Sequence, residues 1–492
     1  MIHLCIVVDF YAENFSIMKK IVFFLISCYF VILSCSQGNI YEDCSPPVVF
    51  DSVACDTILH NHVANKWILK TMKLYYYWED LIPSNMGDSM ELPPDIFFSK
   101  LLNKKEDRFS WVSKNETINN ELLYGKSLNK GFEYLLFYSD TTMYNLTGEV
   151  IFTYPNSYVE KQGIKRGWFF NKISGYQINI DNYNQLLSDS DMKYEFWNVK
   201  DDNTIDTTLI NIKEEMLSLN PILKSTVLSH DGHKVGYLCY QQFKADDGDG
   251  SEIYKKELIE QFLYFKEKGI DNLVLDLRYN SGGDIDLCVL LGSLVVPKTD
   301  TVQVALKVQY NKKLDDAYSS IGIENVTYFK KNFSGYIGDK LDNIIILTGP
   351  NTASASEDVI NMLLPYKKPI LIGLTTYGKN YGSQSFVSTD KNIKWVIQPI
   401  TMKIYNSANE SNFEKGFLPD YEIDENIYIM KEFGDVDEPL LATALDVISN
   451  KKNSKKTTRK CRPKSSKRIF YNSFEKYVAF ERMKKSEILI VK

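Results

Sequence analysis

The chain has 492 residues, of which 44% are hydrophobic and 24% charged, and its formal net charge is -6. A chain of this length holds two to four domains at about 100–200 residues each, and its composition excludes disorder throughout. The negative net charge gives no reason to expect nucleic acid as a partner, and the eight cysteines and five histidines lack zinc-site spacing, so we predict no metal site and no cofactor.

The first 35 residues are typical of an export signal. A basic start at residues 18–20 precedes an apolar run over 21–33, which is shorter than the roughly 20 residues that span a bilayer. Residues 32–35 read Ile-Leu-Ser-Cys and resemble a bacterial lipobox, in which the cysteine receives a lipid after cleavage. We therefore expect Met18 to be the true start. We also expect Cys35 to carry a lipid anchor that holds the exported protein in the bacterial cell envelope, on the periplasmic face or at the cell surface. A plain signal peptide and a buried helix are the alternatives.

Residues 36–56 are polar and are predicted to form a tether, and residues 57–125 a small helical domain. In HVANKWILKTMKLYYYWEDLIP, apolar side chains recur at spacings near three and four, at Val63, Trp67, Ile68, Met72 and Tyr75. This spacing predicts one face of a helix, which Pro83 is expected to end. The stretch PPDIFFSKLLN, with prolines at its start, predicts a second short helix.

Residues 126–216 are predicted to form a β-rich domain, with strands at GFEYLLFY and GEVIFTY. A short helix from Ser157 to Gln162, a strand WFFNKIS between turns at Gly167 and Gly175, and a short helix at DNYNQLLSD follow. This order of elements resembles a PDZ domain, in which a bound peptide adds as an extra strand.

The loop that would hold a peptide terminus in such a domain is degraded in this chain. The glycine-hydrophobic loop of typical PDZ domains corresponds to Gly131, Phe132, Glu133 and Tyr134. We predict that these four residues bind peptide. The alternative is a small β domain that only packs against the rest of the chain.

Residues 217–435 alternate between strands and helices. KVGYLCYQQF, NLVLDLRY, IIILTG and PILIGL are predicted strands, and helices are expected from Ser251 to Lys268 and from Ala355 to about Leu364. Such alternation predicts an α/β domain built on a parallel sheet. Residues 436–492 are expected to add a C-terminal helix and a basic tail, in which the lysines and arginines of 451–468 are solvated.

Three loops of this α/β domain gather chemically useful residues. In right-handed βαβ units the carboxyl ends of parallel strands lie on one edge of the sheet, where sites form. One strand here ends in residues 280–283, Asn-Ser-Gly-Gly, the next in the loop with Ser354, and the third in the loop with Lys379. Each feature alone is more often structural, since serines at helix starts are usually caps. Their meeting at one edge favours a shared chemical role.

Each of these residues has a use in acyl transfer. A serine hydroxyl needs a base to become a nucleophile, and Lys379 can supply it if burial lowers its pKa from about 10.4 towards 7–8. Attack on a peptide carbonyl creates an oxyanion. Backbone N–H groups of Ala355, at a helix start, and of Gly282 or Gly283 are the predicted donors to it.

The motifs DLRYNSGGDI, TASASEDVI and TTYGKN resemble the three signatures of the C-terminal processing (tail-specific) protease family. The resemblance implies that Ser354 is the nucleophile and that Lys379, 25 residues later, is the general base. This spacing also selects Ser354 over Ser356. It further implies a PDZ domain ahead of a catalytic domain with the crotonase and Clp protease fold. The resemblance covers about residues 57–430, and YYYWEDLIP and GFLPDYEID are most similar to the lipoprotein members of Bacteroidetes-type bacteria.

Two positions depart from the family pattern. Many members have a glutamine four residues after the lysine to orient it, but that position here is Ser383, and Gln384 follows it. Some members have an acidic residue about eleven positions after the serine, where this chain has Pro365. The group that orients the lysine is therefore open between Ser383 and Gln384.

The sequence thus predicts a serine endopeptidase that cleaves exported proteins or peptides through an acyl-enzyme. A crotonase-like enzyme acting on acyl-CoA is one rival, but an export signal argues against it because acyl-CoA is cytoplasmic. A non-catalytic peptide-binding lipoprotein with a protease-like fold is another, and the intact serine–lysine spacing argues against that. A Ser-His-Asp hydrolase is weaker, since no GxSxG elbow is present.

Overall fold

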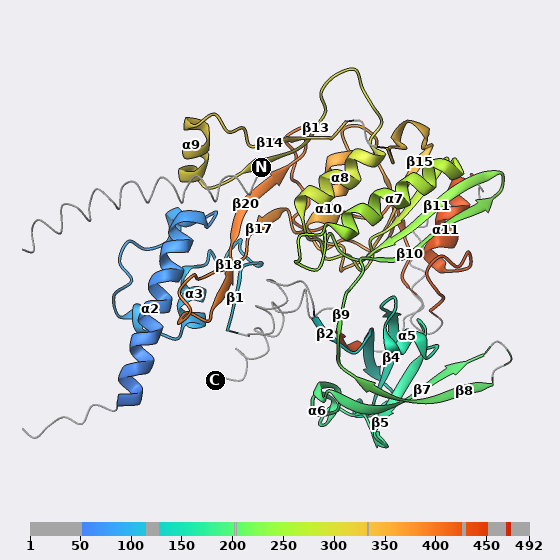
Figure 1. The fold of residues 1–492 in the computed structure, drawn as a ribbon, viewed down its shortest axis with the longest axis horizontal. Coiled ribbons are helices and arrows are strands. Elements are labelled where there is room, and N and C mark those ends of the chain that lie inside the picture. Colours follow the sequence, from blue (N-terminus) through green and yellow to red (C-terminus); the bar gives the residue numbers. More distant parts are fainter. Residues whose placement is uncertain are drawn as a thin grey trace, which may run out of the picture. The chain divides into compact units, whose positions relative to one another are not determined.

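The structure is a computed structural model (Figure 1), and it describes residues 52–114, 127–200, 202, 204–331, 334–425, 430–450 and 469–473. The predicted export signal, the lipidation site Cys35 and most of the tether lie outside the described residues, as does the basic segment 451–468. Among the helices of the described ranges, none is both long and apolar enough to cross a membrane.

A six-stranded sheet forms the centre of the 217–435 region, in the order β10-β11-β12-β15-β16-β21. The first two strands pair antiparallel, and every later pair is parallel, as the alternation of strands and helices predicted. Apolar residues fill β12 and β15 almost continuously because both faces of the sheet are covered. The strands are β10 Ile222–His230, β11 His233–Tyr240, β12 Asn272–Asp276, β15 Asn343–Thr348, β16 Ile370–Gly373 and β21 Tyr421–Glu422.

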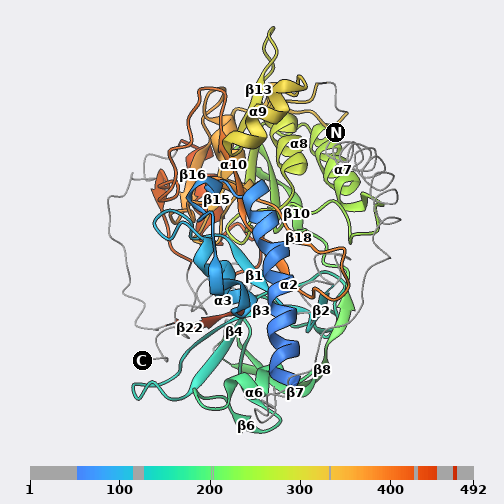
Figure 2. The same ribbon diagram turned by 90° about the vertical axis from the view of Figure 1, so that its left-hand side faces the viewer.

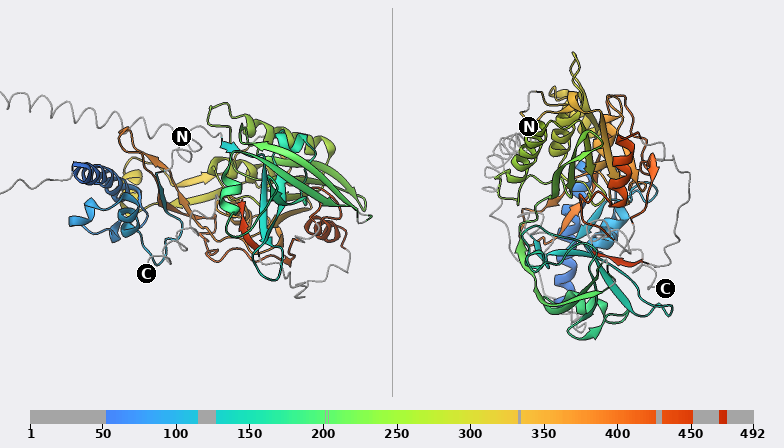
Figure 3. Two further views of the ribbon diagram at one scale, coloured as in Figure 1. Left: turned by 90° about the horizontal axis from the view of Figure 1, so that it is seen from below. Right: turned by 90° about the vertical axis from the view of Figure 1, so that its right-hand side faces the viewer.

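Helices cover both faces of this sheet. On one face, α7, α8 and α10 pack against the sheet in the main hydrophobic core. On the other, α11 buries Leu440, Leu441 and Leu445 against Ile345 and Ile372. The right-hand view of Figure 3 shows the green helices and the orange-red α11 on opposite sides of the sheet. The helices are α7 Ile253–Lys268, α8 Ile285–Val295, α10 Ala355–Leu363 and α11 Pro439–Ile448.

A second, antiparallel sheet, in the order β14-β13-β20-β17, was not predicted. Its strand β17 begins two residues after Lys379, so this sheet holds the chain that follows the lysine. The elements are β13 Val304–Gln309, α9 Lys312–Ser320, β14 Val326–Tyr328, η4 Gly338–Lys340, β17 Tyr381–Ser383 and β20 Ile400–Tyr405.

The 57–125 region is mainly helical, but it is tied to the 217–435 region. Ile68 and Met72 are fully buried in a core that also contains Ile397 and Ile400. A short strand, β1, pairs with β19, which in turn pairs with β18. The elements are α2 Ser52–Tyr75, η2 Glu79–Leu81, η3 Gly87–Glu91, α3 Pro94–Leu101, β1 Trp111–Ser113, β18 Phe386–Val387 and β19 Val396–Gln398.

Two details of the predicted first helix were wrong. The helix ends at Tyr75 rather than at Pro83, because the N–H of Tyr77 donates to the carbonyl of Ile400 at 2.9 Å instead of continuing the helix. Val63, expected on the buried face, is 38% exposed. The early end of the helix comes from this hydrogen bond to a distant strand, which local spacing does not encode.

The 126–216 region forms an antiparallel sheet in the order β22-β3-β4-β5-β7-β8, with β6 beside β5. The side chain of Ser157 accepts the N–H of Glu160 and so caps the predicted short helix. Gly167 and Gly175 have φ of 82° and 84°, as turns flanking the predicted strand require. The elements are β2 Ser127–Asn129, β3 Phe132–Tyr138, β4 Leu146–Thr153, α5 Tyr158–Lys161, β5 Phe169–Ile173, β6 Tyr176–Gln177, α6 Tyr183–Ser188, β7 Asp191–Val199, β8 Ile205–Lys213 and β9 Glu215–Leu217.

The first strand of this sheet, β22, comes from the far end of the chain. It spans Ile469–Asn472 and lies beside β3 (Figure 2). The sequence analysis expected only a helix and a basic tail after residue 435, so this strand was not predicted.

Candidate active site

The glycine loop after β12 lies directly against the turn that carries Ser354. A Cβ atom added to Gly282 would lie 2.8 Å from the Ser354 Cβ and 3.1 Å from the Ala355 nitrogen. A Cβ on Gly283 would lie 2.2 Å from the Phe243 carbonyl oxygen. Both glycines also have positive φ, 106° and 137°. The loop therefore approaches the start of α10 more closely than any other residue type would allow.

Hydrogen bonds of Asn280 join the glycine loop to the turn that carries Ser354. It is fully buried, and its carbonyl accepts the N–H of Ala353 at 3.1 Å and the hydroxyl of Ser356 at 2.9 Å. Its side-chain oxygen accepts the Gly282 N–H at 2.9 Å. Of the predicted oxyanion donors, Gly282 thus already has an acceptor. Within the described residues, the N–H groups of Gly283 and Ala355 donate no hydrogen bond.

Ser354 stands immediately before α10 in a strained backbone conformation. Its φ of 56° and ψ of -121° lie in a region that side-chain-bearing residues rarely adopt, and such strain concentrates at functional sites. Ser354 is half-buried, whereas Ser356 is fully buried with its hydroxyl committed to Asn280. Of the two serines, Ser354 is the more accessible.

One buried carboxylate joins the serine turn to the lysine turn. Glu357 Oε2 accepts the backbone N–H of Ser354 at 3.1 Å and that of Lys379 at 2.7 Å. Its other oxygen accepts the Gly378 N–H at 2.7 Å and the Thr376 hydroxyl at 2.5 Å. Burial raises the pKa of Glu357, and these four hydrogen bonds oppose that rise.

Glu357 was not among the residues predicted for the site. The signal was present, because a serine followed by a glutamate three residues later at a helix start is the capping-box pattern. That pattern predicts the bond to Ser354. It says nothing of the three bonds to the lysine turn, which depend on the tertiary fold.

Lys379 is half-buried, and its Nζ donates to the Ser383 hydroxyl at 3.3 Å. The amide nitrogen of Gln398, on β19, donates to the same hydroxyl at 2.7 Å. The backbone N–H of Gln384 bonds instead to the carbonyl of Pro399. The Lys379 Nζ also lies 5.7 Å from the centre of the Phe109 ring, which belongs to the 57–125 region. Ser383, one of the two residues considered for orienting the lysine, contacts the lysine amine. Gln398, which donates to Ser383, was not suggested by the sequence.

A second acid, Asp358, is buried next to Glu357. Burial raises its pKa well above the usual range, and the charge of Glu357 adds to this effect. Its Oδ1 has no hydrogen-bond partner among the described residues. Both effects favour the protonated form of the Asp358 carboxyl, and the charge of Lys379 opposes them.

The arginine of the DLRYNSGGDI motif anchors a buried ion cluster behind the glycine loop. Arg278 pairs with Asp276 at 2.9 Å, with Glu438 at 2.7 Å and with Glu425. Glu425 also pairs with Arg166 at 2.6 Å. Arg166 comes from the 126–216 region and Glu438 caps α11, so the cluster links three parts of the chain to the end of β12.

The predicted peptide-binding residues are largely buried. Phe132, Glu133 and Tyr134 are 3%, 2% and 7% exposed, and Phe132 packs against other aromatic rings of the module's core. Gly131 has a φ of 90°, and a Cβ there would lie 2.7 Å from the Ser157 Cβ. The edge of β3 that follows these residues is paired with β22.

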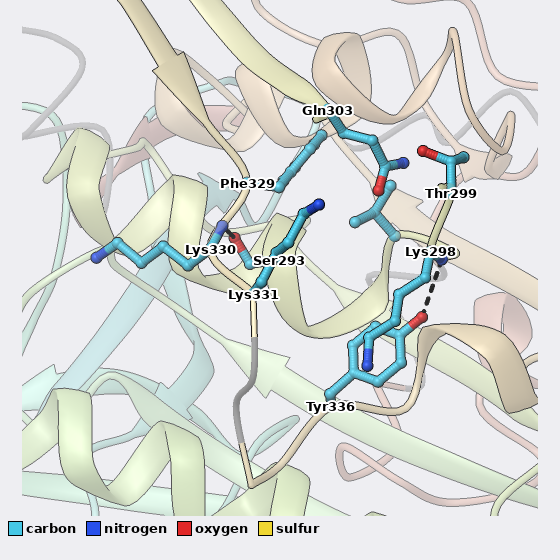
Figure 4. A pocket seen from close by; sticks show the side chains of 9 residues that line it. Ser293, Lys298, Thr299, Gln303, Phe329, Lys330, Lys331 and Tyr336 are labelled. Carbon is cyan, nitrogen blue, oxygen red and sulfur yellow. Dashed lines mark hydrogen bonds between the residues drawn. The ribbon is translucent and has the colours of Figure 1, made fainter. Parts of the chain in front are cut away.

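A cavity of about 190 Å³ lies elsewhere, near the end of α8 (Figure 4). It is lined by Ser293, Val296, Lys298, Thr299, Gln303, Phe329, Lys330, Lys331 and Tyr336. No residue predicted for the site lines it, and it is not part of the serine–lysine arrangement.

Two regions of the chain match models of known protein families. Residues 234–423 match the family model of peptidase family S41, and residues 64–111 match that of the peptidase S41 N-terminal domain. A carboxyl-terminal-processing protease of Synechocystis sp. is 23% identical over 239 residues, 48% of this chain and 49% of that protein. A tail-specific protease of Haemophilus influenzae is 26% identical over 190 residues, 38% of this chain and 24% of that protein. The chain thus spans about half the length, or less, of these curated relatives.

A crystal structure from Bacteroides fragilis, described as that of an S41 protease, has a similar fold. It aligns with a TM-score of 0.66 and 26% identity, covering 78% of this chain and 97% of that one. The resemblance drawn from the three motifs is confirmed: residues 234–423 match peptidase family S41, and residues 64–111 match its N-terminal domain.

Proposed function

We propose that this chain is an exported, lipid-anchored serine endopeptidase with Ser354 as nucleophile and Lys379 as general base. The observation that carries the proposal is the Glu357 carboxylate, one oxygen of which binds the backbone N–H groups of both residues. A carboxylate shared in this way holds the serine turn and the lysine turn in one geometry, as a nucleophile and its base require. The strained backbone of Ser354 supports the same assignment.

The reaction we propose is acyl transfer in two steps. The Ser354 Oγ attacks the scissile carbonyl carbon while its proton passes to the uncharged Lys379 amine. The Ala355 and Gly283 N–H groups stabilise the oxyanion, and the dipole of α10 adds to this effect. As the C–N bond breaks, Lys379 returns the proton to the leaving amine. A water molecule, deprotonated by Lys379, then hydrolyses the ester.

We further propose that the 126–216 region is a PDZ-like module that recruits extended segments of protein or peptide substrates. Its sheet and its two short helices follow the order expected of such a module. The buried ion cluster supports a physical link between this module and the site, because Arg166 and Arg278 share Glu425. The membrane anchor at Cys35 and the crotonase and Clp type of fold belong to the same proposal.

The test is cleavage of unfolded casein by the chain from Ser36 onward, compared with Ser354→Ala and Ser356→Ala. We expect Ser354→Ala and Lys379→Ala to abolish cleavage while leaving the fold intact. Ser356→Ala removes one hydrogen bond, worth about 0.5–1.5 kcal/mol, so it should lower cleavage by no more than about tenfold.

The contrary outcomes are equally distinct. Full activity of Ser354→Ala, with loss of activity in Ser356→Ala, would identify Ser356 rather than Ser354 as the nucleophile. Full activity of Lys379→Ala at neutral pH would remove the lysine as base. Absence of cleavage by every form, with candidate peptides bound but uncut, would favour a peptide-binding lipoprotein that has only the shape of a protease.

A further inference from the structure

A segment from the end of the chain occupies the edge of the PDZ-like module where a peptide would add. Strand β22 pairs antiparallel with β3, with Ile469 opposite Phe137 and Asn472 opposite Leu135. This direction carries the segment towards the start of β3, and so towards the predicted peptide-binding loop. Addition of a strand to an exposed sheet edge is a standard mode of peptide recognition, and here the chain supplies the strand itself.

Aromatic side chains hold this segment on the module. The ring of Phe470 lies 4.9 Å from that of Tyr183, on α6, and 5.4 Å from that of Tyr138, on β3. The ring of Tyr471 lies 6.1 Å from that of Tyr134 and 6.4 Å from that of Tyr183. We call the surface formed by the edge of β3, by Glu133 and by Tyr183 the acceptor groove. The rings of Phe470 and Tyr471 therefore occupy the acceptor groove, in addition to the backbone pairing of β22 with β3.

The end of the acceptor groove selects a hydroxyl group. Ser473 is fully buried, and its Oγ accepts the N–H of Tyr134 at 2.7 Å and donates to Glu133. The other oxygen of Glu133 accepts the hydroxyl of Tyr154 at 3.1 Å. Glu133 is itself 2% exposed, so the pocket around Ser473 is a buried polar site with its hydrogen bonds made.

This chemistry disfavours a free C-terminus as ligand. A terminal carboxylate in the place of Ser473 would lie against the Glu133 carboxylate, and like charges brought together in a buried site repel strongly. A hydroxyl donates to Glu133 instead, and the chain continues past Ser473. The acceptor groove therefore fits the interior of an extended segment better than its end.

We propose that the acceptor groove binds internal, extended peptide segments with two adjacent aromatic residues followed by a hydroxyl residue, and that residues 469–473 occupy it in competition with substrate. The proposal rests on the proposed function only for the identity of the competing ligand, a protein substrate. A segment joined to the same chain competes intramolecularly, so its effective concentration does not fall when the protein is diluted. An added peptide must displace it, so the native tail weakens apparent binding.

The test measures binding rather than cleavage, in the Ser354→Ala chain. The probe is a fluorescein-labelled synthetic peptide with the sequence of residues 467–477, KRIFYNSFEKY, followed by fluorescence anisotropy. Phe470→Ala with Tyr471→Ala removes both rings of the tail and leaves the acceptor groove intact. We expect the peptide to bind this double variant at least tenfold more tightly than the chain with its native tail.

Three controls make the result specific. Ile469→Ala changes a side chain of the same strand that is 53% exposed, and should alter affinity less than twofold. Tyr183→Ala in the double variant should remove the gain, because it alters the groove itself. A peptide that stops at the serine with a free carboxylate should bind more weakly than the same peptide amidated.

If the peptide bound the chain with its native tail and the double variant with equal affinity, the proposed competition would be wrong. Tighter binding that survives Tyr183→Ala would place the peptide elsewhere. If the double variant fails to fold, Ser473→Ala tests the same point, since it removes only the hydroxyl, and an unchanged affinity would overturn the proposal. Because binding is measured without catalysis, failure of casein cleavage would count against the proposed function and not against this groove.

Discussion

Glu357 connects the turn that carries Ser354 to the turn that carries Lys379. Its two oxygens accept four hydrogen bonds, from Ser354, Thr376, Gly378 and Lys379. A carboxylate can accept all four, because both of its oxygens are acceptors. A glutamine cannot, since its amide nitrogen only donates.

We therefore expect Glu357→Gln to lower casein cleavage by at least about tenfold, because the misplacement of reacting groups by about 1 Å can cost a hundredfold. The measurement is kcat and KM on a fluorogenic casein. A positioning role predicts a loss in kcat with little change in KM. A fall in thermal stability with unchanged kcat would mean that Glu357 only supports the fold.

Asp358 gives a prediction about pH. Its pKa is raised in the folded protein, so it keeps its proton at pH values where the unfolded chain, with a pKa of about 3.9, has lost it. Stability therefore falls as pH rises above that value, until the folded-state pKa is reached. Asparagine does not titrate, so Asp358→Asn should gain stability relative to wild type as pH rises from about 4 towards the folded-state pKa.

The measurement is thermal unfolding of both proteins at pH 4, 6 and 8, with the surface variant Asp316→Asn as control. Each unit of pKa difference corresponds to about 1.4 kcal/mol. The Asp316 side chain is 65% exposed, so its substitution makes the same chemical change at the surface. An advantage of Asp358→Asn that shrinks as pH rises would contradict the burial of a neutral acid.

At the scale of elements, α11 shows how one residue can both start a helix and complete an ion cluster. Glu438 is the N-cap of α11, where it accepts the Leu441 N–H at 3.0 Å, and it also pairs with Arg278. The helix that begins there covers the second face of the parallel sheet. Packing of α11 and charge balance behind the glycine loop thus depend on the same carboxylate.

Glu438→Ala should lower the free energy of unfolding by about 3–5 kcal/mol, because it leaves Arg278 short of a buried partner and removes a helix cap. Glu438→Gln keeps an oxygen for the cap and should cost clearly less. Urea denaturation measures both. Asp437→Ala is the matched control, since its side chain, next in sequence, is 75% exposed. A loss for Glu438→Ala no larger than for Asp437→Ala would show that the cluster contributes little.

At the scale of the whole molecule, hydrophobic cores cross the limits between the predicted domains. Ile151, Phe152 and Tyr154 of the 126–216 region share a core with Tyr237 and Ile345 of the parallel sheet. A second core joins helix α2 to β19 and β20. Deletion of about residues 129–216 would therefore expose apolar surface of the sheet and remove Arg166 from the ion cluster. It would not be a clean test of substrate selection.

Because the cores are shared, we expect one cooperative unfolding transition for the chain from Ser36 onward. Differential scanning calorimetry should give a single peak whose calorimetric and van't Hoff enthalpies agree. The Arg166→Met variant should move this peak to lower temperature without splitting it. Two separate peaks would instead indicate that the 126–216 region folds independently of the parallel sheet.

The sequence by itself determined the parallel sheet and the meeting of the serine and lysine loops at one of its edges. The apolar strands that alternate with helices can be recognised from short stretches of sequence, such as NLVLDLRY and IIILTG. The rule that parallel strands end on one edge then predicts that Gly282, Ser354 and Lys379 lie in neighbouring loops. The same local signals predicted the turns at Gly167 and Gly175.

Only the tertiary structure decided which partners these residues meet. The end of α2 at Tyr75, the contact of Ser383 with both Lys379 and Gln398, and the occupation of the β3 edge by β22 all depend on hydrogen bonds between distant segments. The engagement of the Gly282 N–H by Asn280 is local, but the loop conformation that allows it is set by close packing against Ser354. Periodicity in a sequence reports which face of an element is buried. It does not report which distant group will lie there, because that choice is made by the packing of the whole chain.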